Sequence, residues 1–250
     1  MINKNGKVII LNLSIIVMLM VFGTLVSGAQ PLMDQPNTIK GLRLGETLEY
    51  NIKVKGIPAG NQVMQIKDKR QISGREVYHL ESKSIVNKFF NLLYPFSDQI
   101  ESFVVRDGFY PLKFKRELID GEYKGNTTVD IDDSKRVARV VKDNKRYELN
   151  VPKGIQDELS MLYLIRMKNM EIGKEYEFPA IIGIKYYKVG MIVLRSEKIK
   201  TIFGYINTIV VKSIPRDVII WITQDNQRIP VKLEVNTKIG KLVAELKAIS

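Results

Sequence analysis

The chain has 250 residues, of which 45% are hydrophobic and 26% are charged, and its formal net charge is +12 at neutral pH. It contains no cysteine and a single histidine, which excludes disulfides and argues strongly against a zinc site of the usual kind. A chain of this length can bury a sizeable core without covalent cross-links, and one domain is the default expectation.

An export leader is predicted at residues 1–29. Lys4 and Lys7 precede an apolar run from Val8 to Phe22, and the small residues Ser27-Gly28-Ala29 follow where a signal peptidase would cut. The mature chain is then expected in the periplasm or outside the cell. The alternative is an uncleaved N-terminal helix that anchors the protein, because the apolar stretch is nearly long enough to cross a bilayer.

A tether at residues 30–40 leads into a β-rich domain expected over residues 41–250. In the run from Leu48 to Lys55, apolar side chains alternate with polar ones, which places the apolar set on one face of a sheet. The next strand is expected at Gln62–Ile72, and Gly56, Pro58 and Gly60 lie between the two in a predicted turn that needs unusual backbone angles. Further strands are predicted at Val77–Ile85, Gln99–Arg106, Pro111–Ile119, Asn126–Ile131, Arg136–Lys142 and Lys145–Val151.

An apolar segment, Val86–Phe96, interrupts the strands where solvated residues would be usual. We interpret it either as a short helix that plugs one end of a barrel or as the lining of a cavity for an apolar ligand. Basic residues on the following strands could hold an anionic head group, although a charged strand edge explains them equally well. The candidate ligand-binding residues are Phe89, Phe90, Leu93, Tyr94 and Phe96.

Residues 157–170 are predicted to form the principal helix. Apolar residues recur there at spacings of three and four, and Asp157 and Glu158 place negative charge at the helix N-terminus. Beyond Gly173, strands are predicted at Tyr176–Ile182, Lys185–Ser196, Lys198–Phe203, Tyr205–Ser213, Val218–Thr223, Val231–Val235 and Lys241–Ile249.

These elements predict a mainly β fold, in the form of a strongly curved antiparallel sheet or open β-barrel. One central helix would pack on or in the concave side, and the hydrophobic signal helix would precede the domain. An open twisted sheet of more than about ten strands exposes long edges, so a sheet of this size is expected to curl or close.

No catalytic motif is found along the chain. His79, the only histidine, has no Gly-x-Ser-x-Gly or Ser-x-x-Lys companion, and no glycine-rich phosphate loop occurs. We therefore predict no catalytic residue, no metal and no cofactor. The scattered carboxylates Asp98, Glu101, Asp157 and Glu158 leave an envelope-polymer hydrolase as an alternative.

Several short segments together resemble a known family. Gly45-Glu46-Thr47-Leu48-Glu49-Tyr50 is followed by Gly56-Ile57-Pro58-Ala59-Gly60, and this opening resembles a bacterial exported family known as domain of unknown function 3108. The resemblance covers nearly the whole mature chain and implies an exported, predominantly β protein with no assigned catalytic residues. Further segments follow in the same order: Tyr94-Pro95-Phe96, Ile100-Glu101-Ser102, Asp157-Glu158-Leu159-Ser160, Arg166, Trp221-Ile222-Thr223, Arg228-Ile229-Pro230-Val231 and Ile239-Gly240.

Two of these segments suggest structural roles. Arg166, on the predicted helix, could pair with a buried acid such as Glu101 or Asp98 and lock the helix to the sheet. Trp221, followed by Asp225 and Pro230, is typical of a strand, a turn and the start of an edge strand.

The preferred interpretation is an exported cell-envelope protein that binds an amphipathic or lipid-like ligand, or an envelope protein, without catalysing a reaction. A scaffold that contacts partners through exposed sheet edges is a further alternative. The basic charge favours anionic envelope ligands, although a solvated basic surface explains it equally well. Nucleic acid is not an expected partner, and membrane contact is expected only through the leader, if it is retained.

Overall fold

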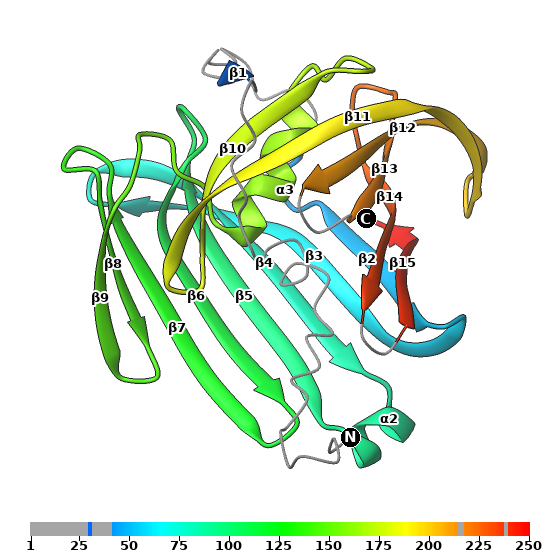
Figure 1. The fold of residues 1–250 in the computed structure, drawn as a ribbon, viewed down its shortest axis with the longest axis horizontal. Coiled ribbons are helices and arrows are strands. Elements are labelled where there is room, and N and C mark those ends of the chain that lie inside the picture. Colours follow the sequence, from blue (N-terminus) through cyan, green and yellow to red (C-terminus); the bar gives the residue numbers. More distant parts are fainter. Residues whose placement is uncertain (1–29, 32–41, 215–217, 238–239) are drawn as a thin grey trace.

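The computed structural model describes residues 30–31, 42–214, 218–237 and 240–250. The predicted signal helix and most of the tether therefore lie outside the described residues. Within them, a 15-stranded sheet curls around a central helix and stays open, in the order β1-β10-β11-β12-β13-β14-β15-β2-β3-β4-β5-β6-β7-β8-β9 (Figure 1). This architecture confirms the prediction of a mainly antiparallel, strongly curved open sheet.

The strands form two antiparallel meanders that join through the pairing of β15 with β2. The edge strands of the sheet are β9 on one side and the short β1 on the other, where β1 pairs in parallel with β10. The strands are β1 (Gln30–Pro31), β2 (Thr47–Val54), β3 (Ile57–Ile72), β4 (Arg75–Val86), β5 (Phe96–Val105), β6 (Pro111–Asp120), β7 (Tyr123–Asp132), β8 (Val137–Lys142), β9 (Lys145–Asn150), β10 (Glu175–Ile182), β11 (Lys185–Thr201), β12 (Gly204–Ile214), β13 (Ile219–Thr223), β14 (Pro230–Thr237) and β15 (Gly240–Ile249).

The β2–β3 hairpin corrects the predicted turn. Only Lys55 and Gly56 form it, with φ angles of 50° and 82°, whereas Pro58 and Gly60 already belong to β3. The register shifts there, because Ile52 pairs with Gly60 while the next residue, Lys53, pairs with Pro58. Gly60 is needed for space rather than for a turn, since an added Cβ would lie 2.2 Å from the backbone oxygen of Ile85.

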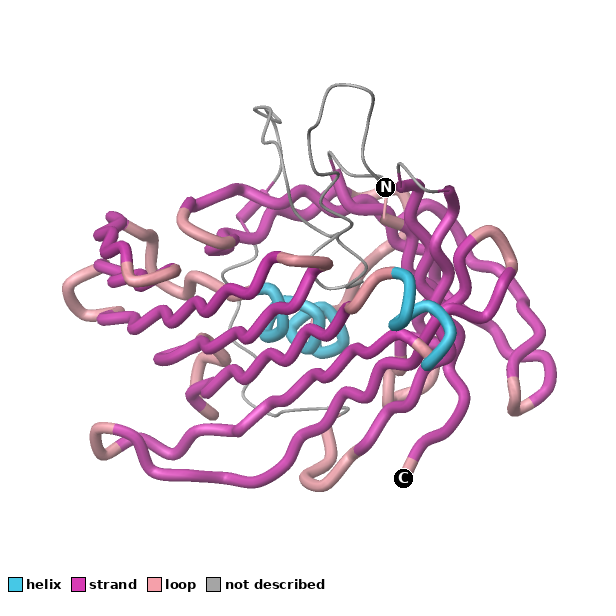
Figure 2. Tube along the Cα trace, turned by 90° about the horizontal axis from the view of Figure 1, so that it is seen from below, coloured by secondary structure: helices cyan, strands magenta, loops and turns pink. Residues whose placement is uncertain are grey.

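The principal helix is α3 (Glu158–Met167), close to the predicted range. Its N-terminus is closed by a capping box, in which Asp157 accepts from the backbone of Ser160 and the Ser160 hydroxyl accepts from the backbone of Asp157. Every residue from Glu158 to Arg166 is buried. Figure 2 shows why: the helix lies inside the curl, with strands on more than one side.

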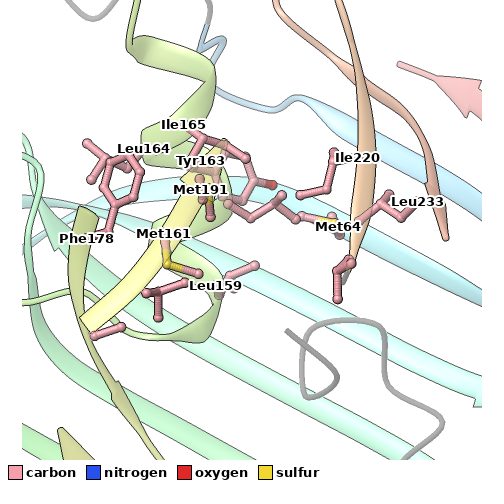
Figure 3. Close-up of a cluster of buried hydrophobic side chains, with 14 of the residues drawn as sticks. Met64, Leu159, Met161, Tyr163, Leu164, Ile165, Phe178, Met191, Ile220 and Leu233 are labelled. Atoms are coloured by element: carbon pink, nitrogen blue, oxygen red, sulfur yellow. The ribbon is translucent and has the colours of Figure 1, made fainter. Parts of the chain in front are cut away.

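The core forms where the two meanders face each other across α3. Figure 3 shows Phe178, from β10, on one side of the helix, and Met64 and Ile220, from β3 and β13, on the other. The predicted inward alternation of β2 is confirmed, since Leu48, Tyr50 and Ile52 are buried in the same cluster. In the part of the chain that the structure describes, no helix has the length and hydrophobicity needed to cross a membrane.

Candidate functional site

The five predicted ligand-binding residues lie in the β4–β5 connection and at the first position of β5. A short helix there, α2 (Lys88–Leu93), buries none of its residues, and Phe89 and Leu93 are 67% and 70% exposed. Tyr94 donates a hydrogen bond from its hydroxyl to Asp120 at 2.9 Å, and Phe96 is buried in the core. These residues therefore do not line one site: Phe89 and Leu93 are in solvent, Tyr94 binds Asp120 and Phe96 is in the core. Phe89 and Leu93 are in solvent because α2 lies beyond the ends of β4 and β5 (Figure 1).

A pocket of about 460 Å³ lies beside the turn that joins β13 to β14. Its wall is mostly apolar and its rim carries side-chain amides, a hydroxyl and one carboxylate. This volume and this division of surface are typical of a site for a small molecule. The lining residues are Phe203, Ile206, Asn207, Thr223, Gln224, Asp225, Gln227, Ile229, Val231 and Ile249.

The Asp225 side chain organises the turn at the pocket rim. One of its carboxylate oxygens accepts from the hydroxyl of Thr223 at 2.7 Å and from the backbone amides of Gln227 and Arg228 at 3.0 and 3.1 Å. The Thr223 hydroxyl in turn accepts from the amide of Ile229 at 2.9 Å. Asp225 is therefore engaged in holding the turn, which leaves the amides of the rim as the groups that can meet a ligand.

The strand after this turn corrects a second prediction. Pro230 begins β14, but β14 lies between β13 and β15 and is an interior strand, not an edge. Pro230 pairs with Ile222 at a register shift, where the regular ladder is already interrupted. A proline without an amide hydrogen is tolerated at such an irregular strand start. Trp221 lies in β13, as expected, and Lys232 of β14 covers its ring at 4.5 Å from the centroid.

A buried ion pair connects the turn to the central helix. Both terminal guanidinium nitrogens of Arg166 donate to Glu46, at 2.6 and 2.9 Å, and one also donates to the carbonyl of Gln227 at 3.2 Å. Arg228 reaches back from the turn and donates to the carbonyl of Lys168 at 2.5 Å, at the end of α3. The helix thereby fixes the position of the pocket rim.

The predicted partners of Arg166 were therefore wrong, although the expected ion pair exists. Asp98 is instead held by Arg116, with nitrogen to oxygen distances of 2.7 and 3.3 Å. Glu101 alternates with buried residues of β5 and faces the outer side, where it lies 3.0 Å from His79. The alternation of β5 thus separates the two acids, and Asp98 has its own cation.

A second polar cluster lies at the N-terminus of α3. Arg116 joins Asp98 to Glu158, whose carboxylate is 3.5 Å from the guanidinium. Burial raises the pKa of Glu158 to about 7; Arg116 partly offsets this, whereas Asp98 and Asp157 add to it. Burial also raises the pKa of Asp157 to about 6, although hydrogen bonds oppose the shift.

This geometry bears on the carboxylates considered for hydrolysis. Asp157 caps the helix with one oxygen and accepts from the Ser102 hydroxyl with the other. Glu101 lies on the outer face with His79 and Lys115, so the four acids do not line one site. Asp98 and Glu158 share Arg116 as a buried counter-ion, an arrangement that links helix to sheet.

The sequence placed Thr223, Asp225, Ile229 and Val231 in segments that resemble the family, but nothing in it indicated that they line a pocket. Phe203 and Ile206 belong to runs that read as ordinary strands, and the turn residues come from a distant segment. The apolar pair Ile202 and Phe203 could have indicated a binding surface, because polar residues are usual at a hairpin tip. Both side chains are more than half exposed.

The fold and the site together define an open, curled antiparallel β protein with an enclosed helix and a braced pocket. The family "Protein of unknown function (DUF3108)" matches residues 49–247, so the chain belongs to this family. This match confirms the resemblance found in the sequence. No curated protein matches the chain in sequence.

Several solved bacterial structures are similar to this chain to different degrees. A β-barrel-like protein of the domain of unknown function DUF1849 from Brucella abortus has a TM-score of 0.53 at 11% identity, over 83% of this chain and 98% of that one. A Bacteroides fragilis protein with a YmcC-like fold, proposed to be exported, has a TM-score of 0.35 at 9% identity, over 83% and 96%. A proposed lipoprotein from Parabacteroides distasonis has a TM-score of 0.34 at 8% identity, over 85% and 98%. The Brucella likeness supports the fold alone.

Proposed function

We propose that this is an exported cell-envelope protein that binds an amphipathic, lipid-like molecule and does not convert it chemically. The observation that carries the proposal is the pocket of about 460 Å³ beside the β13–β14 turn, with its apolar wall and amide rim. The leader predicted at residues 1–29 and the membership in a family that the sequence resemblance describes as exported support the location.

The chemistry of the pocket matches an apolar chain with a small polar end. Phe203 and Ile206 offer exposed hydrocarbon surface beside the buried Ile229 and Val231, and this surface would gain about 25 cal/mol for each Å² removed from water. Asn207 and Gln227 present exposed side-chain amides at the rim, where they can donate to and accept from an uncharged or anionic head.

The rim is held before any ligand arrives. Arg166 binds the carbonyl of Gln227, and Arg228 binds the carbonyl of Lys168, so the turn is attached to α3 at two points. A pocket that is already ordered loses little conformational entropy on binding, which favours affinity.

Two adjacent residues of the β11–β12 hairpin provide a matched test. Phe203 lines the pocket and Ile202 does not, yet their exposed fractions are 54% and 53%. We expect Phe203→Glu to weaken the binding of a fluorescent fatty-acid probe roughly tenfold, and Ile202→Glu to leave it unchanged, because loss of one aromatic contact costs about 1.5 kcal/mol.

The purified protein should also be extracted and the extract analysed by mass spectrometry for co-purified lipid. Absence of both co-purified lipid and probe binding would refute the proposal. Equal losses in the two variants would show that the probe binds elsewhere on the hairpin. Retention of probe binding in Phe203→Glu, with an unchanged melting temperature, would exclude this pocket.

A further inference from the structure

Among the residues that the structure describes, the short helix α2 has an apolar face that nothing covers. Phe89, Leu92 and Leu93 occupy positions i, i+3 and i+4, so they share one side of the helix. Their exposed fractions are 67%, 86% and 70%. A helix without buried residues gains little stability from packing. The packing of the described fold therefore does not explain why three large apolar side chains share one side of α2.

Two more exposed apolar residues extend this face. Ile57, at the start of β3, is 58% exposed, and Ile85, near the end of β4, is 45% exposed. Asn87 joins these strand ends to the helix, since its side chain donates to the carbonyl of Pro58 at 2.8 Å. We call the five apolar residues Ile57, Ile85, Phe89, Leu92 and Leu93 the α2 tip; Figure 1 shows α2 at the rim of the molecule.

The α2 tip is held rigidly from both ends. At the start, Asn87 donates from its backbone to Ala59 at 2.8 Å and accepts from the amide of Phe90 at 3.0 Å, which caps the helix. At the end, the Tyr94 hydroxyl binds Asp120, and the carbonyl of Pro95 accepts from Gly121 at 2.9 Å. The apolar side chains are therefore presented outward by a fixed support.

Basic side chains predominate at the α2 tip, and the nearest exposed acid is Glu122, in the β6–β7 turn whose Gly121 amide donates to the carbonyl of Pro95. Lys83 and Lys88 are exposed there, and neither lies within ion-pair distance of an acidic side chain among the residues that the structure describes. The side chain of Lys55 lies against Gly240 of β15 instead. The two segments that build the tip, residues 50–67 and 82–97, contain no aspartate or glutamate. Any large surface that meets the tip must therefore accept hydrocarbon and positive charge together.

We propose that the α2 tip docks the protein onto the surface of an anionic phospholipid bilayer. Phe89, Leu92 and Leu93 enter the boundary between head groups and acyl chains, and the lysines meet the phosphates. Apolar insertion together with basic residues is the combination by which monotopic proteins bind membranes, at about 1 kcal/mol for each lysine near the surface. Membrane contact then does not depend on the leader, contrary to the expectation from sequence.

The test uses the chain from Gln30 onward, which retains every described strand and both described helices, and vesicles of phosphatidylglycerol and phosphatidylcholine. We expect co-sedimentation with vesicles rich in phosphatidylglycerol and weaker binding in high salt. The double variant Leu92→Asp/Leu93→Asp should lose at least about tenfold in affinity, because two buried leucines are worth more than 1.4 kcal/mol.

Matched changes at the β11–β12 hairpin serve as the control. Ile202 and Tyr205 are also exposed, at 53% and 67%, so Ile202→Asp/Tyr205→Asp adds the same charge to another projecting tip. This control should bind vesicles as the unaltered chain does. Failure of the unaltered chain to bind, or equal losses in both double variants, would overturn the proposal. A concentration-dependent dimer that only the α2 variant abolishes would assign the tip to a second copy of the chain instead.

Discussion

Replacement of Arg166 by methionine tests the strongest structural claim, that a buried ion pair joins helix, sheet and pocket. The guanidinium is 1% exposed and lies 2.6 Å from the Glu46 carboxylate, whose side chain is 6% exposed. Methionine fills a similar space without the charge. The Glu46 carboxylate would then remain buried without its cation, while the Gln227 carbonyl would lose a donor.

The expected loss is large because the remaining charge cannot reach water. Removal of one partner of a buried pair costs about 3–5 kcal/mol, whereas removal of both charges is often close to neutral. For Arg166→Met, the urea midpoint should fall by roughly 1–2 M, taking a slope of about 2–3 kcal/mol per M. The double variant Glu46→Gln/Arg166→Met should recover most of this loss.

An exposed pair of nearly the same length provides the control. Arg195 lies 2.5 Å from Glu197, but the two side chains are 51% and 34% exposed. Arg195→Met makes the same chemical change and should cost about 0–1 kcal/mol, because water already screens an exposed pair. Urea unfolding, followed by circular dichroism and by tryptophan fluorescence from Trp221, gives the free energies.

Equal effects of Arg166→Met and Arg195→Met would refute the role of burial. The role of burial would also be refuted if the double variant had the same free energy of unfolding as Arg166→Met alone. The loss of stability would then come from packing rather than from an unpaired Glu46 carboxylate. Binding of the fatty-acid probe adds a second readout: the double variant should fold but bind more weakly, since the Gln227 carbonyl is no longer held by Arg166.

Two further predictions concern the helix N-terminus and the β2–β3 hairpin. Burial raises the pKa of Glu158 from 4.5 to about 7, so the folded state binds a proton that the unfolded state has released; stability from this group falls as the pH rises across that interval. In urea unfolding at pH 4.5 to 7, Glu158→Gln should reduce the slope of the free energy of unfolding against pH by up to about 1.4 kcal/mol per pH unit. Equal slopes for the variant and the unaltered protein would contradict the raised pKa of Glu158. Gly60→Ala should destabilise by about 1–3 kcal/mol in thermal unfolding because its Cβ would meet the Ile85 carbonyl oxygen. Gly125→Ala, whose nearest contacts would be with the side chain of Tyr123 rather than with backbone, should cost less, and the reverse order would show that β3 can shift at Gly60.

Local patterns in the sequence determined the type of most elements, although the two strands predicted at Lys185–Ser196 and Lys198–Phe203 form the single strand β11. Alternation of apolar and polar residues is a property of consecutive positions, so it identified β2 with its inward-facing Leu48, Tyr50 and Ile52. The same holds for α3, since Asp157, Glu158 and the apolar spacing act within a few turns of one helix. The ordered segments shared with the family were also readable along the chain.

Only the tertiary structure decided which distant residues meet. Arg166 pairs with Glu46 across 120 positions. Pro230 starts an interior strand because β14 pairs with both β13 and β15. The apolar residues of α2 look in sequence like core residues, yet the anchors of Asn87 and Tyr94 hold them in solvent. The physical reason is common to these cases. Periodicity specifies which way a side chain faces, whereas its partner depends on how the sheet curls, and that is set by contacts summed over the whole chain.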